Sequence, residues 1–252
     1  MKMDTTVALV TGATDGIGQA LAIELAQQKI TALAVIDFTS QVNDVAQEAN
    51  AIAGRAVATP YCGDFTDARF RASVVQDFSK KHGPVTLCVP LPGGGTVVTV
   101  KAPDTENQTA VFPDEQYAQI VENHLLTPIH WASEAVAELR RAEKPSPAMI
   151  VFLGSIDSRG NCGEVDRAAS KLGLNKAAAN LISDARLCDV RFGVIHPVYI
   201  NSPFTQALGS AHLIDREIPN TQERRLIQPE EVADAICQRV SEEYCVGVEF
   251  TF

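Results

Sequence analysis

The sequence predicts an α/β fold, with helices on both faces of a doubly wound parallel sheet of about seven strands. Two observations predict it. Short apolar runs alternate with longer helical patterns along the whole chain, and a glycine-rich turn follows the first run. Strands that are apolar throughout are buried on both faces, as in parallel sheets. Since no linker or low-complexity tract divides residues 1–252, we expect a single domain.

The apolar runs expected as strands lie at about residues 7–10, 32–36, 56–61, 86–89, 148–153, 190–195 and 246–250. The segments expected as helices lie at about residues 18–28, 42–53, 67–80, 114–143, 166–187 and 229–240. Pro229 opens the last helix, because proline is well tolerated in a first helical turn. Two longer segments, 90–111 and 197–228, are expected to be irregular. The first is placed at the carboxyl edge of the sheet, where such folds bind ligands.

Composition and charge argue against several classes of partner. The net charge of −10 and the absence of a basic stripe disfavour nucleic acid. No apolar run approaches the length of about 18 residues that a membrane helix needs, and the N-terminus does not resemble a signal peptide. Six scattered cysteines without a C-x-x-C pair indicate reduced thiols and a cytoplasmic protein. The five histidines show no metal-ligand spacing, so we expect no metal site.

The first predicted strand runs directly into the segment Thr11-Gly12-Ala13-Thr14-Asp15-Gly16-Ile17-Gly18. Glycine permits a tight turn and a close backbone approach, and the following helix presents unpaired N–H groups to a diphosphate. The turn therefore predicts Rossmann-type dinucleotide binding. The alternative is a turn that only packs helix on sheet. The residues expected to contact the cofactor here are Gly12, Thr14, Asp15, Gly16, Ile17 and Gly18.

Asp37 stands at the end of the second predicted strand. A carboxylate at this place can accept hydrogen bonds from both hydroxyls of an adenosine ribose, and it repels a 2′-phosphate. No Arg or Lys stands in the glycine turn or directly after Asp37. The sequence therefore favours NAD over NADP. The alternative is that Asp37 only caps a turn.

The glycine spacing T-G-x-x-x-G-I-G resembles that of the short-chain dehydrogenase/reductase family, and further motifs extend the resemblance over nearly the whole chain. They are the segments 62–67 (C-G-D-F-T-D), 123–125 (N-H-L), 150–155 (ending in Ser155), 169–171 (A-S-K), 197–203 (from Pro197 to Pro203) and 228–233 (Q-P-E-E-V-A). The resemblance implies that Asp64 contacts the adenine and that Lys171 binds the nicotinamide ribose. It also implies cofactor contacts from Gly93, Pro197 and Ile200.

The resemblance also implies the chemistry. Ser155 would polarise a substrate oxygen, Lys171 would hold the ribose, and Asn123 would support a water relay in a kinked helix. Pro128 fits such a kink, because it leaves the His124 carbonyl without its usual donor. The reaction would move a hydride between NAD(H) and a small alcohol or carbonyl compound.

Three departures from the family pattern affect this chemistry. Arg167 stands where the family has the tyrosine that donates or removes a proton. P-L-P-G at 90–93 replaces N-N-A-G, and Val198 replaces the glycine after Pro197; the C-terminal tail differs as well. A guanidinium stays protonated in proteins, so Arg167 cannot act alternately as acid and base. It can still donate hydrogen bonds to an oxyanion or an anionic substrate, which would also offset its repulsion with Lys171 one turn away.

Three interpretations of Arg167 stay open. The chain is a divergent enzyme with altered acid–base chemistry, an inactive NAD-binding relative that serves as a partner or regulatory subunit, or a dehydrogenase with a substitute proton donor. Candidate substitutes are Tyr199, His196 and His124, although each of these is more often a packed residue.

A homo-oligomer, either a dimer or a tetramer, is also expected. The helices at 114–143 and 166–187 resemble those that pair across two-fold axes in this family. The second helix carries alanines suited to close approach, although these could instead pack only on the sheet: Ala168, Ala169, Ala177, Ala178 and Ala179.

Overall fold

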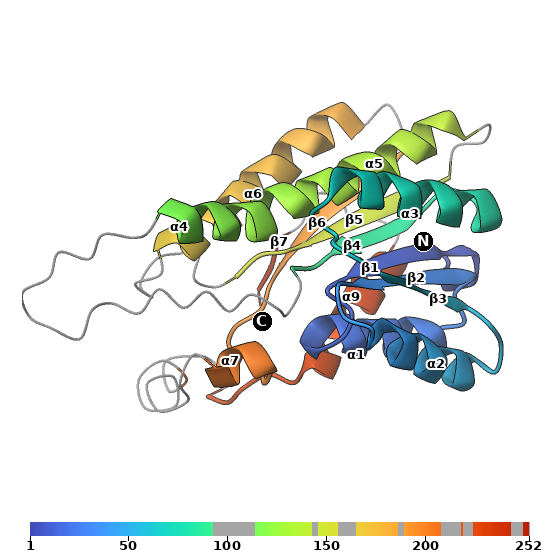
Figure 1. The fold of residues 1–252 in the computed structure, drawn as a ribbon, viewed down its shortest axis with the longest axis horizontal. Coiled ribbons are helices and arrows are strands. Elements are labelled where there is room, and N and C mark those ends of the chain that lie inside the picture. Colours follow the sequence, from blue (N-terminus) through green and yellow to red (C-terminus); the bar gives the residue numbers. More distant parts are fainter. Residues whose placement is uncertain are drawn as a thin grey trace, which may run out of the picture.

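The computed structural model describes residues 1–92, 114–142, 146–155, 165–185, 189–207, 218, 224–242 and 249–251. Its centre is a sheet of seven parallel strands in the order β3-β2-β1-β4-β5-β6-β7 (Figure 1). The strands are β1 (Val7–Thr11), β2 (Ala32–Asp37), β3 (Ala58–Cys62), β4 (Leu87–Pro90), β5 (Ala148–Leu153), β6 (Val190–His196) and β7 (Glu249–Thr251). The predicted fold class is confirmed.

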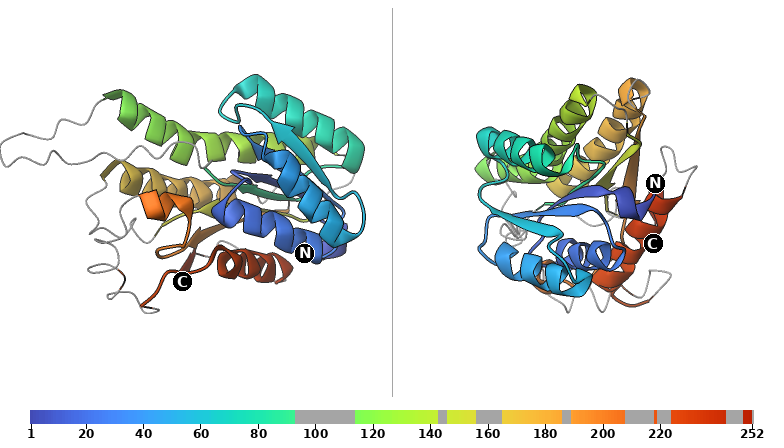
Figure 2. Two further views of the ribbon diagram at one scale, coloured as in Figure 1. Left: turned by 60° about the horizontal axis from the view of Figure 1, so that its bottom comes forward. Right: turned by 90° about the vertical axis from the view of Figure 1, so that its right-hand side faces the viewer.

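Helices cover both faces of this sheet (Figures 1 and 2). One face is covered by α1 (Gly16–Gln27), α2 (Val42–Ala53) and α9 (Pro229–Ser241). The other is covered by α3 (Ala68–His82), α5 (Thr127–Arg141) and α6 (Val165–Ala185). Each parallel connection crosses over the sheet through a helix, so that the central strands β1, β2 and β4 are buried on both faces.

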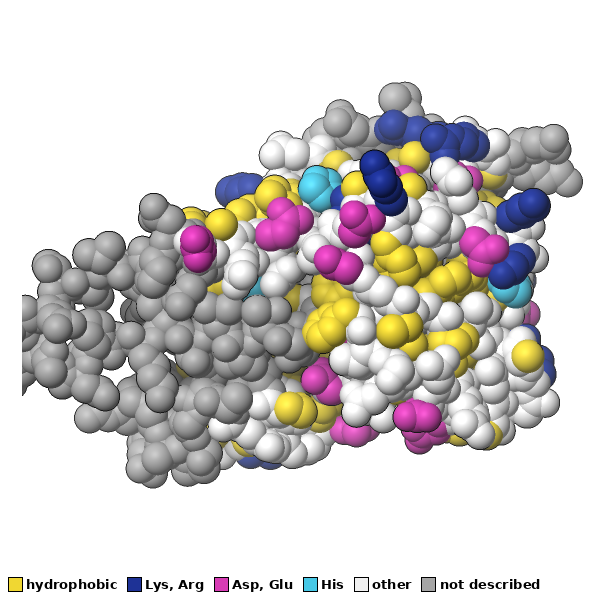
Figure 3. Space-filling model, in the orientation of Figure 1, with side chains coloured by type: hydrophobic (Ala, Val, Ile, Leu, Met, Phe, Trp, Pro, Cys, Tyr) yellow, Lys and Arg dark blue, Asp and Glu magenta, His cyan; other side chains and the backbone are white. Residues whose placement is uncertain are grey.

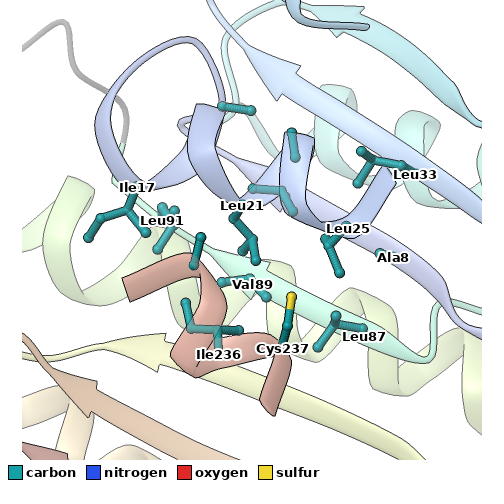
Figure 4. Close-up of a cluster of buried hydrophobic side chains, with 14 of the residues drawn as sticks. Ala8, Ile17, Leu21, Leu25, Leu33, Leu87, Val89, Leu91, Ile236 and Cys237 are labelled. Atoms are coloured by element: carbon teal, nitrogen blue, oxygen red, sulfur yellow. The ribbon is translucent and has the colours of Figure 1, made fainter. Parts of the chain in front are cut away.

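Alternate residues of β1, β2, β4, β5 and β6 enter two separate apolar cores. In β1, Ala8 and Val10 join the core under α1, whereas Leu9 joins the core under α3 and α5. Figure 4 shows the first core, in which Leu21 and Leu25 of α1 and Ile236 of α9 lie around Val89 of β4. The continuous apolar runs of the sequence are therefore explained by burial on both sides.

The helix expected at 114–143 is interrupted. The structure has α4 (Asp114–Val121), a π-helical turn η2 (Glu122–Leu126) and then α5. The N–H of Thr127 donates to the carbonyl of Glu122, five residues back, and Pro128 follows without an N–H of its own. A proline removes a helical hydrogen bond and crowds the preceding turn, so the widened turn lies where Pro128 requires an adjustment.

The segment expected to be irregular contains regular structure. Within 197–228 the structure forms a short helix, α7 (Pro203–Ala207), and a bridge between Ile200 and Ile227. Main-chain bonds from Ile227 to Tyr199 (2.9 Å) and from Asn201 to Ile227 (2.8 Å) flank that bridge. No helix of the described residues is long and apolar enough to cross a bilayer.

Candidate functional site

The candidate site lies at the carboxyl edge of the sheet, where β1 separates two directions of winding. From β1 the sheet continues through β2 and β3 on one side and through β4 to β7 on the other. Ligands of open parallel sheets bind at this switch point. Thr11 joins its two sides, because its Oγ1 donates to the carbonyl of Leu91 at 2.6 Å.

Each of the three glycines in the turn after β1 is required for its own steric reason. Gly12 adopts φ +59°, and a Cβ there would lie 2.6 Å from the carbonyl oxygen of Pro92. Gly16 adopts φ +48° and begins α1. A Cβ on Gly18 would lie 2.0 Å from the carbonyl oxygen of Gly12. Because side chains are excluded, the backbone and the N-terminus of α1 form a cradle that fits a diphosphate.

Asp37 is buried at the end of β2 and faces this turn. Its Oδ2 accepts from the N–H of Thr14 at 3.2 Å and from the Thr14 hydroxyl at 2.7 Å, and its Oδ1 accepts from the N–H of Phe38 at 2.7 Å. The turn-capping role that the sequence left open is thus present in the structure. A carboxylate has about four acceptor sites, so these bonds are compatible with a further role toward ribose hydroxyls.

A second carboxylate, Asp15, stands beside Asp37. Asp15 is half-buried at the N-cap of α1, and its side chain makes no capping hydrogen bond there. Burial raises the pKa of Asp15, and the negative charge of Asp37 raises it further. Asp15 belongs to the predicted turn, but its approach to Asp37 was not predicted, because the two acids are distant in sequence.

Asp64 lies on an exposed loop next to the end of β2. The N–H of Gly63 donates to the Asp37 carbonyl at 3.0 Å, and Asp64 Oδ1 accepts from the N–H (2.9 Å) and the hydroxyl (2.6 Å) of Thr66. Trp131 of α5 holds the same loop from behind: its Nε1–H donates to the Phe65 carbonyl at 3.0 Å. The two predicted adenosine contacts, Asp37 and Asp64, are therefore adjacent.

Ser155 and Lys171 lie at the other end of the site, on the segment after β5 and on α6. Both side chains are buried. The Lys171 ammonium donates to the carbonyl of Leu153 at 2.7 Å, two residues before Ser155. The helix and the strand that carry these residues are thus joined at the place where the resemblance expects a ribose and a substrate oxygen.

Asn123 lies in the π-helical turn η2, beside the helix that carries Lys171. The two segments approach closely at Gly173 of α6, where a Cβ would lie 3.1 Å from Cδ1 of Leu125. π-Helical turns often occur at functional sites, because they shift the residues that follow around the helix. The predicted kink is thus a widened turn that contains Asn123 itself.

The structure describes the burial of some of the remaining predicted site residues but not of others. Ile17 and Pro197 are buried, and Ile200 is half-buried and bridged to Ile227. Arg167 lies in the first turn of α6, but its side chain is outside the described part of the chain. Gly93 also lies outside the described residues.

His196, one of the three candidate proton donors, contacts the main chain of Ser155. Its Nδ1 is 3.2 Å from the main-chain carbonyl of Ser155. Tyr199 and His124 are half-buried. The sequence placed His196 only at a strand end, since the contact joins two strands and has no local pattern.

Comparisons with known proteins agree with this arrangement. The family model described as short chain dehydrogenase matches residues 6–212. The chain is 25% identical over 245 residues to 3-oxoacyl-(acyl-carrier-protein) reductase FabG of Vibrio harveyi, covering 94% of this chain and 90% of that protein. It is 29% identical over 229 residues to cyclohexanol dehydrogenase of Rhodococcus sp. strain TK6, covering 83% and 81%.

Solved structures show the same fold. A short chain dehydrogenase from Burkholderia cenocepacia J2315, solved in complex with NADP, has a TM-score of 0.83 at 21% identity and covers 100% of this chain and 98% of that one. A short-chain dehydrogenase/reductase variant from Serratia marcescens has a TM-score of 0.84 at 18% identity, covering 100% and 98%. Because the family model spans most of the sequence and the site motifs lie together at one sheet edge, the chain belongs to the short-chain dehydrogenase family.

Proposed function

We propose that this chain is an NAD(H)-dependent oxidoreductase that acts on a small alcohol or carbonyl compound. One observation carries the proposal: the glycine cradle and the Ser155–Lys171 pair occupy the two sides of one switch point. A bound nicotinamide supplies or accepts the hydride. Ser155 would hydrogen-bond the reacting oxygen, and Lys171 would orient the ribose with its ammonium group.

The preference for NAD over NADP is supported by charge. Asp37 and Asp15 place two carboxylates at the turn, and a 2′-phosphate there would meet both. Figure 3 shows lysine and arginine side chains gathered at the upper right, over the ends of α3 and α5. The last turns of these helices carry Lys80, Lys81 and Arg140. They lie at the opposite edge of the sheet, because helices that cover a parallel sheet run against its strands.

The replacement of the family's tyrosine by Arg167 affects which substrate we expect. Since a guanidinium cannot release and regain a proton at neutral pH, Arg167 would act as a hydrogen-bond donor to a negatively charged oxygen. A substrate with an anionic group would also offset the charge of Lys171 on the next turn. The relatives named for 3-oxoacyl reduction and cyclohexanol oxidation suggest the panel: a 3-oxoacyl thioester, cyclohexanol and an acidic ketone.

A second candidate function is a catalytically inactive NAD-binding partner or regulatory subunit. It is favoured by Arg167 at the tyrosine position and by the Lys171 ammonium, which already binds a main-chain carbonyl. Turnover by the purified chain, measured as NADH absorbance with each member of the panel, separates the two. Binding of NADH without turnover of any of them would favour the inactive role.

We further propose that the protein is a cytoplasmic homo-oligomer, a dimer or a tetramer. Leu126 of η2 and Leu172 of α6 are large apolar side chains exposed to solvent at 38% and 49%. An interface between copies would cover them. Light scattering at micromolar concentration tests this. A monomer would contradict the proposal, and Leu172→Glu should shift an oligomer toward monomer.

A further inference from the structure

The imidazole of His196 occupies a space that exists only because residue 154 is glycine. His196 ends β6 and is 2% exposed. A Cβ on Gly154, at the end of the neighbouring β5, would lie 2.4 Å from Nδ1 and 2.5 Å from Cε1 of this ring. The imidazole of His196 therefore packs against Gly154 of the neighbouring segment, and Gly154 is the residue directly before Ser155.

The hydrogen bond of the ring fixes its tautomer. Nδ1 lies 3.2 Å from the carbonyl oxygen of Ser155, and a carbonyl oxygen only accepts. Nδ1 must therefore carry the hydrogen, which leaves Nε2 of the neutral ring as an acceptor. Within the described ranges this Nε2 is buried and has no hydrogen-bond partner. Such an atom is costly, so the placement of the ring requires an explanation beyond packing.

The hydrogen bond between His196 and Ser155 links β6 to the chain beyond the last paired residues of β5 and β6. The last paired residues of β5 and β6 are Leu153 and Ile195, and the N–H of Gly154 donates to the Ile195 carbonyl at 2.7 Å. Ser155 is the next residue. A side-chain donor from β6 thus binds the main chain of Ser155 beyond the last residue pair of the two strands.

We propose that His196 is a positioning residue that orients Ser155 through its main-chain carbonyl. This inference rests on the proposed function, in which the Ser155 hydroxyl must point at a substrate oxygen. A displacement of about 1 Å in such a group can cost about 100-fold in rate. His196 acts by donation from Nδ1, so its role needs the donor but neither a charge nor proton transfer.

A pair of variants separates positioning from acid–base chemistry. Asn can place an amide N–H near the position of Nδ1, whereas Leu fills a similar volume without any donor. With NADH and acetoacetyl-CoA as probes, His196→Asn should keep kcat within about threefold, and His196→Leu should lower kcat about 10- to 100-fold while KM for NADH stays unchanged. An equal loss in both variants would mean that the imidazole itself exchanges protons, and no loss in either would mean packing alone. Either outcome overturns the proposal.

Two measurements do not depend on turnover. A long-range ¹H–¹⁵N spectrum of histidine-labelled protein, with His196 identified by its missing signal in His196→Asn, should show a protonated Nδ1 and a bare Nε2 at neutral pH. Hydrogen exchange of a peptide covering 148–155 should be faster in His196→Leu than in the wild type or His196→Asn. The reverse tautomer, or unchanged exchange, would refute the positioning role. If no probe is turned over, the proposed function fails, but these two results still decide the role of His196.

Discussion

The two sides of the site follow family rules to different degrees. The adenosine side, from β1 to the loop after β3, keeps every glycine its geometry needs and adds a second acid at the turn. The nicotinamide side keeps Ser155 after β5 and Lys171 on α6, but it carries Arg167 in place of a tyrosine and Val198 in place of a glycine. Under the proposed function, cofactor binding and substrate turnover depend on different residues, so that turnover can change while cofactor binding is preserved.

The largest effect is expected from restoring the acid. Wild-type protein should reduce neutral ketones poorly, and Arg167→Tyr should raise kcat for cyclohexanone by about 10²- to 10⁴-fold, the usual contribution of general acid catalysis. Steady-state kinetics with NADH would measure it, with Arg167→Ala as the control that removes the charge without adding an acid. Brisk wild-type turnover that survives Arg167→Ala would show that a donor elsewhere is at work. No gain in Arg167→Tyr would show that the nicotinamide side has lost more than its acid.

A single added methyl group should disrupt cofactor binding on the adenosine side of the site. Gly18→Ala would place a Cβ 2.0 Å from the Gly12 carbonyl oxygen, so the cradle must shift and NADH affinity should fall about 100-fold or more. Energy transfer from Trp131 to bound NADH would report binding, because Trp131 is the single tryptophan and bonds the loop that carries Asp64.

Gly54→Ala is the matched control. Gly54 has φ +65° at the end of α2, and a Cβ there meets no atom within 4 Å. This change should cost about 1 kcal/mol of stability through backbone strain and leave NADH affinity unaltered. If both variants bind NADH like the wild type, the cradle is not the cofactor site.

A smaller effect concerns the choice of cofactor. Asp37→Ala removes the buried carboxylate at the turn, so the ratio of NADPH to NADH dissociation constants should fall about 10-fold, with some loss of affinity for both because Thr14 loses its partner. Calorimetry with both cofactors measures the ratio. Asp64→Asn is the control, since the resemblance assigns Asp64 to the adenine that both cofactors share. NADPH binding as tight as NADH to the wild type would contradict the NAD preference.

Sequence reasoning succeeded where the determining pattern is local. The bounds of α2 and β5 were predicted as the structure has them, because unbroken apolar periodicity fixes a buried strand or a helix face. A kink at Asn123 was implied by the family resemblance and is consistent with Pro128, but its π-helical form within the expected single helix was not predicted. The pairs Asp15–Asp37 and Gly154–His196 were missed, because each joins two segments whose approach depends on the assembled sheet.

The smallest predicted effect is on stability and tests the acidic pair on the adenosine side. Burial and the charge of Asp37 raise the pKa of Asp15 in the folded protein, so the charged form that exists at neutral pH is disfavoured in the fold relative to the unfolded chain. Asp15→Asn should therefore raise Tm at pH 7, by about 1–3 °C because solvent screens a half-buried group. The gain should shrink as the pH falls through the raised pKa and vanish below the ordinary aspartate range, where the wild-type carboxyl is protonated in both states. Asp44→Asn, in the exposed first turn of α2, is the control and should leave Tm unchanged or lower it slightly, because it removes a favourable charge at a helix N-terminus. A Tm gain for Asp15→Asn that is equally large at acid pH would mean that the carboxylates do not repel each other, and the electrostatic argument against a 2′-phosphate would then rest on Asp37 alone.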